Sequence, residues 1–125
     1  SMRRQLTDGS GAASATQFSV QFDHGDGFVV DGLVLVGRNP QAHAGEVVSR
    51  LVSLPSADMS ISKTHAQFGP AEDGVLVVMD RGSTNGTSVI RHGVVRQLEP
   101  GRPTTLLDAD VVVFGDRQMS VSLRG

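Results

Sequence analysis

Side chains that can donate hydrogen bonds to an anion are concentrated in residues 60–68. In this segment Ser62 offers a rotatable O–H group and Lys63 offers three charged N–H groups, a combination suited to holding a phosphate or a carboxylate. The ordinary alternative is a surface turn with a satisfied histidine, His65, at its rim. The segment by itself leaves both interpretations open.

A second group of donors occupies residues 80–87. Asn85-Gly86 lies between two apolar stretches, and this pair is a strong hairpin signal because both residues tolerate positive φ. A plain turn does not explain why Ser83 and Thr84 add further hydroxyl groups to the same loop. The composition of the loop therefore favours a binding role in addition to a turn.

Short β-strands are expected to position these two loops. Stretches rich in Val, Leu and Phe are separated by Gly, Pro, Asn and Asp, and several alternate apolar and polar residues. Helical periodicity is absent, and the abundance of valine favours strands. We predict an all-β fold, a two-sheet antiparallel β-sandwich of about eleven short strands. The clearest expected strands lie at residues 18–22, 33–36, 46–51, 65–68, 75–79, 87–90, 94–98, 111–114 and 119–123.

The predicted strand order brings the two donor-rich segments together. The strands at 65–68 and 75–79 are expected to form a hairpin closed by the turn at 69–74, so the open end of the hairpin carries both segments. The same logic does not place Gly37-Arg38, which by itself indicates a strand end beside a solvated arginine. Simple up-and-down alternation would put Arg38 at the opposite end.

Composition excludes several classes of function. The chain has 125 residues, with 11 Lys and Arg against 13 Asp and Glu, a formal net charge of −2, and no Cys, Trp or Tyr. A basic surplus and stacking aromatics are missing, so we expect no nucleic-acid partner. The lack of Cys excludes disulfides, thiolate zinc sites and thiol nucleophiles. Apolar runs are short and no leader is visible, so we expect a cytoplasmic domain without direct membrane insertion.

The N-terminal residues differ in character from the rest. Residues 3–16 are polar, small and glycine-rich without periodicity, which is typical of a flexible linker, and Ser1-Met2 is interpreted as a cloning remnant. We therefore assign residues 1–16 to this linker and residues 17–125 to one domain. We expect the domain to be part of a larger parent protein.

Three motifs, taken in order, resemble the signature of the forkhead-associated (FHA) domain: Gly37-Arg38, Ser62-x-x-His65 and Ser83-Thr84-Asn85-Gly86-Thr87. The C-terminal part is similar as well, with Leu98-x-Pro100-Gly101, Leu106-x-Asp108-x-Asp110-Val111-Val112 and Phe114-Gly115. The resemblance extends over residues 18–125. Each motif is weak alone, whereas their order, spacing and coverage together are specific.

The resemblance implies a β-sandwich that recognises phosphothreonine in partner proteins with loops at one end. Carried over by position, the residues expected to contact the phosphate are Arg38, Ser62, Lys63 and Thr84. The residues expected to contact the peptide backbone are Asn85 and Ser60. The expected scaffold of the site is Gly37, His65 and Gly86. The resemblance also brings Arg38 to the loops, through a strand that crosses between the sheets.

The expected function is to recruit or dock phosphorylated partner proteins in serine/threonine kinase signalling. We expect no cofactor, no metal and no catalytic residue, and the Ser-Lys-Thr-His sequence at 62–65 suggests a bacterial source. The alternative is an FHA-fold module that binds a partner, or its own parent chain, without phosphate.

Two features depart from the family pattern. The segment 39–59 is longer than usual between the Arg and Ser motifs; we expect a strand from Glu46 to Leu54 and a flexible stretch at 41–45. This segment either changes which flanking residues are read or covers the site. Ala109 replaces a glycine common in the family, which should affect only the local turn.

Two rival chemistries are weaker. Ser62, His65 and Asp80 are the residue types of a hydrolase triad, but a Ser and a His three apart across a strand start should point to opposite faces, and no nucleophile elbow is present. Residues 23–27 contain potential metal ligands and are better interpreted as a turn. We therefore predict a binding module and not an enzyme.

Overall fold

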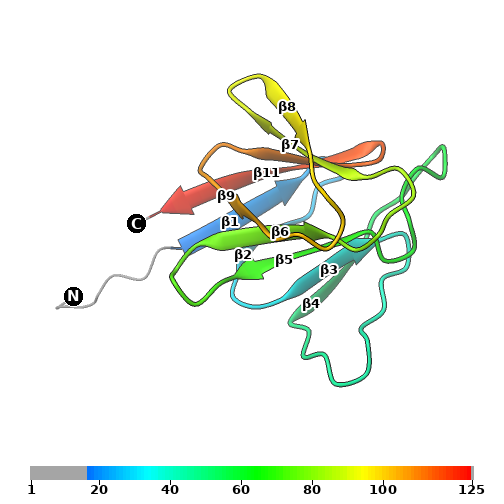
Figure 1. Cartoon of the computed structure of the whole chain (residues 1–125), viewed down its shortest axis with the longest axis horizontal. Helices are drawn as coiled ribbons and strands as arrows, with labels where there is room; N and C mark the ends of the chain where they lie inside the picture. The colour runs from blue at the N-terminus through cyan, green and yellow to red at the C-terminus, as the bar shows by residue number, and fades with distance from the viewer. Residues whose placement is uncertain (1–16, 125) are drawn as a thin grey trace, which may run out of the picture.

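The computed structural model describes residues 17–124, which form eleven strands in two sheets packed face to face (Figure 1). Within this range no helix is long and apolar enough to cross a membrane. The linker assigned to residues 1–16 lies outside the described residues, so the domain boundary at residue 17 stays a prediction. The strands are β1 (Gln17–Phe22), β2 (Gly27–Val30), β3 (Val34–Gly37), β4 (Arg50–Ser53), β5 (Ala66–Pro70), β6 (Leu76–Asp80), β7 (Thr87–Arg91), β8 (Val94–Gln97), β9 (Thr104–Leu106), β10 (Val111–Phe114) and β11 (Arg117–Arg124).

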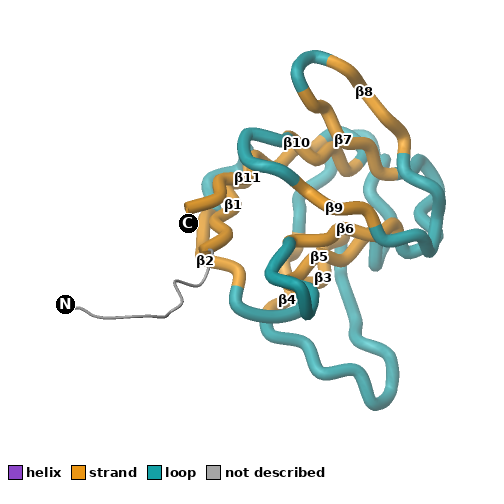
Figure 2. Tube along the Cα trace, turned by 60° about the vertical axis from the view of Figure 1, so that its left-hand side comes forward, coloured by secondary structure: helices purple, strands orange, loops and turns teal. Residues whose placement is uncertain are grey.

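One sheet has the strand order β2-β1-β11-β10-β7-β8, and the other has the order β4-β3-β5-β6-β9. Figure 2 shows the hairpin of β7 and β8 extending away from the rest of its sheet. The neighbouring strands are antiparallel, except that β3 and β4 run parallel with Leu35 opposite Leu51. The predicted two-sheet sandwich is therefore confirmed, and the five-stranded sheet is mixed where an antiparallel one was expected.

The core lies between the sheets and follows the alternation of the sequence. In β1 every second residue is buried. The ring of Phe22 is central, with its centroid 6.2 Å from that of Phe28 and 6.4 Å from those of Phe68 and Phe114. At the edge of the sandwich the guanidinium carbon of Arg50 lies 4.1 Å from the centroid of the Phe28 ring, a cation–π contact between β4 and β2.

The parallel pairing of β3 and β4 decides where Arg38 lies. The chain leaves β3 at Gly37, returns through a loop, and runs along β4 in the same direction as β3, so both strands end at the same edge of the sheet. β5 then runs back antiparallel to β3. The expected crossing between sheets is wrong, because β3, β4 and β5 share one sheet. Because β3 and β4 end on the same side, Arg38 lies beside the loop that carries Ser62.

The loop after β3 is fixed to the outer face of the five-stranded sheet. The Nη1 atom of Arg81 donates to Glu46 Oε2 at 3.2 Å and to Gln67 Oε1 at 2.9 Å. Leu35, the register partner of Gln67, shares this outer face and is fully buried. Arg38 and Lys63 remain exposed, so the segment 39–59 does not cover these two predicted site residues.

The strand expected from Glu46 begins only at Arg50. The Glu46 carboxylate accepts the backbone N–H of His43 at 3.0 Å and contacts Arg81, and both contacts require a compact loop. The His43 hydrogen bond, helped by Arg81, lowers the pKa of Glu46 below its usual value in spite of partial desolvation. The stretch expected to be flexible is also tied down, because Gln41 N–H donates to Thr64 Oγ1 at 3.1 Å.

The turn between β9 and β10 surrounds a buried carboxylate. Asp110 is 1% exposed and accepts hydrogen bonds from Arg91 Nε at 2.9 Å, Arg91 Nη2 at 2.7 Å and Leu107 N–H at 2.7 Å. Burial raises the pKa of Asp110, but the bonds from Arg91 and Leu107 outweigh it and the pKa is lowered. Ala109 adopts a φ of 72°, the left-handed conformation for which glycine is better suited.

Replacing Phe22 by alanine should leave a cavity among the packed phenylalanine rings. We expect Phe22→Ala to lower the free energy of unfolding by about 3–5 kcal/mol. Val47 is 88% exposed, and Val47→Ala should change the free energy by less than about 0.5 kcal/mol. Urea unfolding followed by circular dichroism measures both. Equal effects of the two substitutions would contradict the central position of Phe22.

Candidate functional site

The predicted site residues lie at the end of the sandwich where β3, β4 and β6 finish and β5 and β7 begin. Backbone hydrogen bonds join the end of β3 to the loop before β5. Arg38 N–H donates to Ser62 O at 3.0 Å, and Asn39 N–H donates to Lys63 O at 3.0 Å. Arg38 therefore lies beside Ser62 and Lys63, not at the opposite end as up-and-down alternation would place it.

Gly37 permits this close approach of two backbone segments. A Cβ atom at Gly37 would lie 2.1 Å from Lys63 O and 2.8 Å from Lys63 C. These are backbone atoms, and Lys63 O is held by the hydrogen bond from Asn39 N–H, so they have little freedom to move aside. A side chain at this position would push Arg38 away from the loop that carries Ser62.

The buried side chain of His65 connects the two donor-rich loops, one at Ser62 and the other at Gly86. Its ring is fully buried, and its Nδ1 accepts the backbone N–H of Ser62 at 3.0 Å. Since Nδ1 accepts a hydrogen, Nε2 carries the ring hydrogen and donates it to Gly86 O at 2.8 Å. Gly86 has a φ of 84°, but the hairpin indicated by Asn85-Gly86 is not formed: β6 and β7 belong to different sheets, and Asn85 does not adopt a positive φ. One neutral imidazole thus fixes both loops.

Asp80 organises the loop between β6 and β7 in a way that the sequence did not reveal. The carboxylate is fully buried and accepts hydrogen bonds from the Ser83 hydroxyl, from Thr87 Oγ1 at 2.7 Å, and from the backbone N–H groups of Gly82 and Ser83, both at 3.0 Å. Burial alone raises the pKa of Asp80, but these bonds outweigh it and hold the pKa below 3.8. Ser83 belongs to this internal network and does not serve a ligand.

The residues predicted to contact a phosphate are neighbours in the structure. Thr84 N–H donates to Ser62 Oγ at 2.9 Å, which places Thr84 next to Ser62 and leaves the Ser62 hydroxyl hydrogen for another acceptor. Arg38, Lys63 and Thr84 are exposed, and Ser62 is half-buried. The Nη1 atom of Arg38 lies 3.9 Å from the Sδ atom of Met59, an exposed residue with a φ of 61°. Two cationic and two hydroxyl-bearing residues therefore lie on neighbouring segments, three of them exposed and Ser62 half-buried.

Asn85 lies at the border of this donor group. Its Nδ2 donates to Ser60 O at 3.0 Å, so its side-chain amide has a fixed orientation. Its Oδ1 makes no hydrogen bond with any residue in the described range 17–124 and is free to accept an N–H group from a ligand. Asn85 and Ser60 also line a polar hollow with Asp58 and Asp116.

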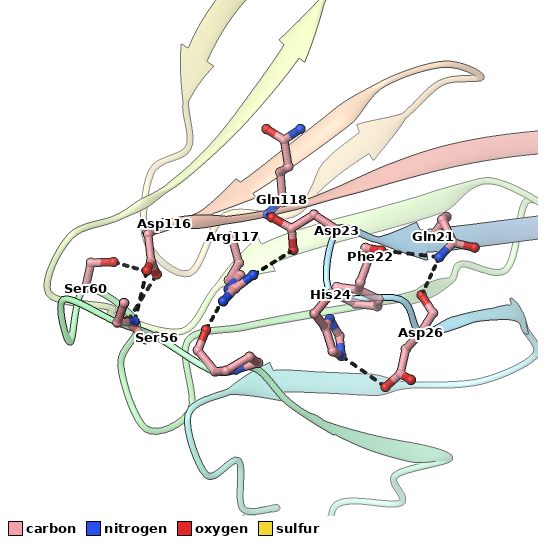
Figure 3. Close-up of polar contacts among 12 residues, drawn as sticks. Gln21, Phe22, Asp23, His24, Asp26, Ser56, Ser60, Asp116, Arg117 and Gln118 are labelled. Carbon is pink, nitrogen blue, oxygen red and sulfur yellow. Dashed lines mark hydrogen bonds and ion pairs between the residues drawn. The ribbon is translucent and has the colours of Figure 1, made fainter.

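The turn between β10 and β11 supports Ser60 and was missed in the sequence analysis. Asp116 Oδ1 accepts the hydroxyl groups of Ser56 and Ser60, each at 3.0 Å, and Oδ2 accepts Ala57 N–H at 3.2 Å (Figure 3). A Cβ atom on Gly115 would lie 2.7 Å from Ser60 O, so glycine is required there. Partial burial raises the pKa of Asp116, but the hydroxyl bonds outweigh it and lower the pKa. The spacing of these residues along the chain gave no signal of their contact.

The structure does not assemble a hydrolytic centre at Ser62. Both ring nitrogens of His65 are bonded to backbone groups, and neither bonds to the Ser62 hydroxyl or to Asp80. A group of three or more potential metal ligands is likewise not found within residues 17–124. The segment 23–27 forms the turn between β1 and β2, closed by the bond from Phe22 N–H to Asp26 O at 2.7 Å.

Comparisons with known proteins identify a single family. The model of the family described as FHA domain matches residues 34–115, a range that contains every predicted site residue. A comparison with curated proteins found no match.

Several solved structures share this fold. The FHA domain of a Chlamydia trachomatis protein is 27% identical, with a TM-score of 0.65, and the alignment covers 87% of this chain and 99% of that one. The FhaA FHA domain, in complex with the intracellular domain of another protein, is 25% identical, with a TM-score of 0.58 and coverage of 83% and 98%. A domain from a study of phosphothreonine-dependent FHA domain interactions is 24% identical, with a TM-score of 0.62 and coverage of 87% and 98%, and shows the fold alone.

The buried carboxylate of Asp80 should make stability depend on pH in the acid range. Its lowered pKa stabilises the folded chain above the ordinary value of 3.8, and this stabilisation is lost as the pH falls through the folded-state pKa. We expect Asp80→Asn to lower the unfolding free energy at neutral pH by about 1–3 kcal/mol, because buried donors lose an acceptor. The variant should also reduce the slope of unfolding free energy against pH in acid.

Urea unfolding across a pH series measures both quantities. The control is Asp73→Asn, an exposed carboxylate in the turn between β5 and β6, which should change the unfolding free energy by less than about 0.5 kcal/mol. An unchanged acid slope in Asp80→Asn would contradict the stabilising role of this carboxylate.

Proposed function

This chain belongs to the FHA domain family, and from that premise we propose that it binds phosphothreonine-containing segments of partner proteins through the loops around Arg38, Ser62 and Thr84. FHA domains are binding modules and not enzymes. The use of the site for docking phosphorylated partners in cytoplasmic serine/threonine kinase signalling is part of the same proposal.

The observation that carries the proposal is the convergence of Arg38, Ser62 and Thr84 on one exposed locality. The three residues come from three segments. A backbone hydrogen bond from Arg38 N–H to Ser62 O at 3.0 Å and a bond from Thr84 N–H to the Ser62 hydroxyl oxygen at 2.9 Å hold them together before any ligand arrives. A phosphothreonine carries about −1.5 to −2 charges and three strong acceptor oxygens. One guanidinium and two hydroxyl groups match those oxygens with little reorganisation.

Lys63 and Asn85 extend the proposed contact. The Lys63 ammonium adds positive charge beside Arg38, whereas the nearby Asp80 carboxylate is buried and fully occupied by its own donors. Two exposed cations, Arg38 and Lys63, therefore flank Ser62 although the chain carries a net charge of −2. The carboxylates of Asp58 and Asp116 lie on the side of Ser60 and Asn85. The free Oδ1 of Asn85 suits a backbone N–H beside the phosphothreonine. Gly37, His65 and Gly86 act from beneath as scaffold.

The similar structures support a protein partner. The FhaA FHA domain, 25% identical to this chain, was solved with the intracellular domain of another protein. The Chlamydia trachomatis domain agrees with the proposal that this module acts in bacterial signalling.

Titration of one peptide in three forms, with phosphothreonine, phosphoserine or unmodified threonine, tests the proposed function by isothermal calorimetry. The peptide is first selected from an oriented phosphothreonine library, and we expect only its phosphothreonine form to bind. Arg38→Ala should weaken this binding by about 2–5 kcal/mol, since the phosphate loses its charged partner. Arg124→Ala, the same change at the end of β11, serves as control and should have little effect.

Equal affinity for the phosphothreonine and threonine forms would overturn the proposal. That result would instead favour the alternative, an FHA-fold module that binds without phosphate. Retained affinity in Arg38→Ala would show that the phosphate lies elsewhere on the domain.

Asp116 should influence peptide affinity through Ser60 and Asn85 without touching the peptide. Asn85→Ala should weaken binding by about 0.5–1.5 kcal/mol through loss of one neutral hydrogen bond. We expect Asp116→Ala to weaken binding by a smaller amount. In the Asn85→Ala background, Asp116→Ala should have a smaller effect, because the amide that Ser60 O orients is gone and only the contact expected from Ser60 itself remains.

Calorimetry on the four chains of this double-mutant cycle measures the coupling. Asp26→Ala removes another exposed carboxylate, one that contacts only His24, and controls for the change in net charge. Additive effects of Asp116→Ala and Asn85→Ala would contradict the positioning role.

A further inference from the structure

β8 is an open edge on the side of the six-stranded sheet away from β2. Among the described residues 17–124 it pairs only with β7, and the hairpin extends away from the other strands (Figures 1 and 2). All four residues of β8 are exposed. The exposed fractions of Val94 and Val95 are 66% and 63%, which is unusual for neighbouring valines on a strand.

The register of the hairpin shows which backbone groups of β8 are free. Leu98 N–H donates to Thr87 O at 2.8 Å, so this pair faces inward, and hydrogen-bonded pairs recur at every second residue of an antiparallel ladder. Val94 and Arg96 therefore direct their backbone groups to β7. Val95 and Gln97 direct theirs outward, where the described part of the chain offers no partner strand. Two donors and two acceptors are available to an added strand.

A groove of about 250 Å³ lies along the inner face of this hairpin. Val89 and Arg96 are register partners, as are Arg91 and Val94, so these side chains share one face. The groove is lined by Val89, Arg91, His92, Val94, Arg96 and Thr104. It therefore combines apolar surface with cationic groups, directly beside the open edge.

The charge of the groove is one-sided. None of its lining residues is acidic. Arg91 is engaged by the buried Asp110 at 2.7 Å, whereas Arg96 makes no ion pair within residues 17–124. With Arg91 paired to Asp110, Arg96 is the arginine of the groove that is available to a ligand. An occupant with carboxylates would complement it.

The other sheet edges are less suited to accept a strand. β9 has three residues and follows Pro103. β2 begins at Gly27, and the side chain of Gln21 already donates to the carbonyl groups of Gly25 and Asp26 beside it. β4 carries the Arg50 contact with the Phe28 ring. β8 has neither such a cover nor a proline.

We propose that β8 is a second docking site, at which an extended acidic segment of a partner protein adds as a further strand, independently of the phosphothreonine site. The backbone of the segment bonds to Val95 and Gln97. Its β-branched side chains pack against Val94, and its carboxylates pair with Arg96. Main-chain bonds provide general affinity, and the charge of the groove selects acidic sequences.

Selection from a phage library of random unphosphorylated peptides tests this proposal, with the wild-type chain and the Val95→Pro chain as parallel baits. Proline at 95 removes an outward N–H group and none of the bonds to β7, so an edge strand tolerates it. We expect the wild-type bait to enrich peptides that alternate β-branched residues with Asp or Glu. Their affinity for Val95→Pro should fall roughly tenfold or more.

Matched variants separate the contributions. Val95→Thr keeps the N–H group and a β-branched side chain and should bind as wild type does. Arg96→Glu changes only an exposed side chain and should weaken binding of the selected peptides roughly tenfold or more. The affinity of the wild-type chain for these peptides should fall as the salt concentration rises. Arg38→Ala should leave their affinity unchanged. Retained phosphothreonine binding by Val95→Pro would confirm that this variant is folded.

Four results would overturn the proposal. One is a selection that enriches no peptide over the Val95→Pro bait. The second is affinity that is insensitive to Arg96→Glu, and the third is peptide binding that disappears in Arg38→Ala. The last is dimerisation of the wild-type chain in sedimentation equilibrium that Val95→Pro abolishes, which would place a second copy of the chain on the edge.

Discussion

The neutral ring of His65 is the interaction on which the geometry of the site depends. It accepts a hydrogen bond from Ser62 N–H and donates one to Gly86 O, at 3.0 Å and 2.8 Å, inside a fully buried environment. A buried group that lost either bond would leave an unsatisfied polar atom, so the two loops are held at one separation. Ser62 and Thr84 stand on those two loops, and the bond between them at 2.9 Å follows from that spacing.

The site separates groups that hold the loops from groups that face solvent. Gly37, His65 and Asp80 are buried and fully engaged with other parts of the chain. The residues proposed to bind the phosphate, Arg38, Ser62 and Thr84, are exposed or half-buried and keep hydrogen atoms available for donation. This arrangement suits an anion, because preorganised donors need little rearrangement on binding, and the buried carboxylate of Asp80 already accepts hydrogen bonds from its own donors. The net charge of the chain has little influence at such short range.

The segment 39–59 after β3 also helps to position the residues of the site. Its contact from Glu46 to Arg81 lies on the outer face of the sheet, where Leu35 is fully buried, and its return as β4 runs parallel to β3. Arg38 is thereby delivered to the loops without a crossing between sheets. On the opposite sheet β8 is left uncovered, and its open backbone and cationic groove distinguish it from the other edges. The two proposed binding surfaces therefore differ in chemistry: the loops around Arg38 suit a phosphate, and the β8 edge suits an extended acidic segment.

Local pattern in the sequence determined the β class, most strands, the hairpin of β5 and β6, and the meeting of the Ser62 and Thr84 loops, because alternation and turn residues act between neighbours in the chain. It missed β2 and β9, which are short, and it extended β4 back to Glu46, because a loop fixed by a distant Arg81 looks locally like a strand. The parallel pairing of β3 and β4 and the contact of Asp116 with Ser60 were decided only by the tertiary structure. These contacts join residues far apart in the chain, and they exist only once packing of the core has fixed the positions of the loops.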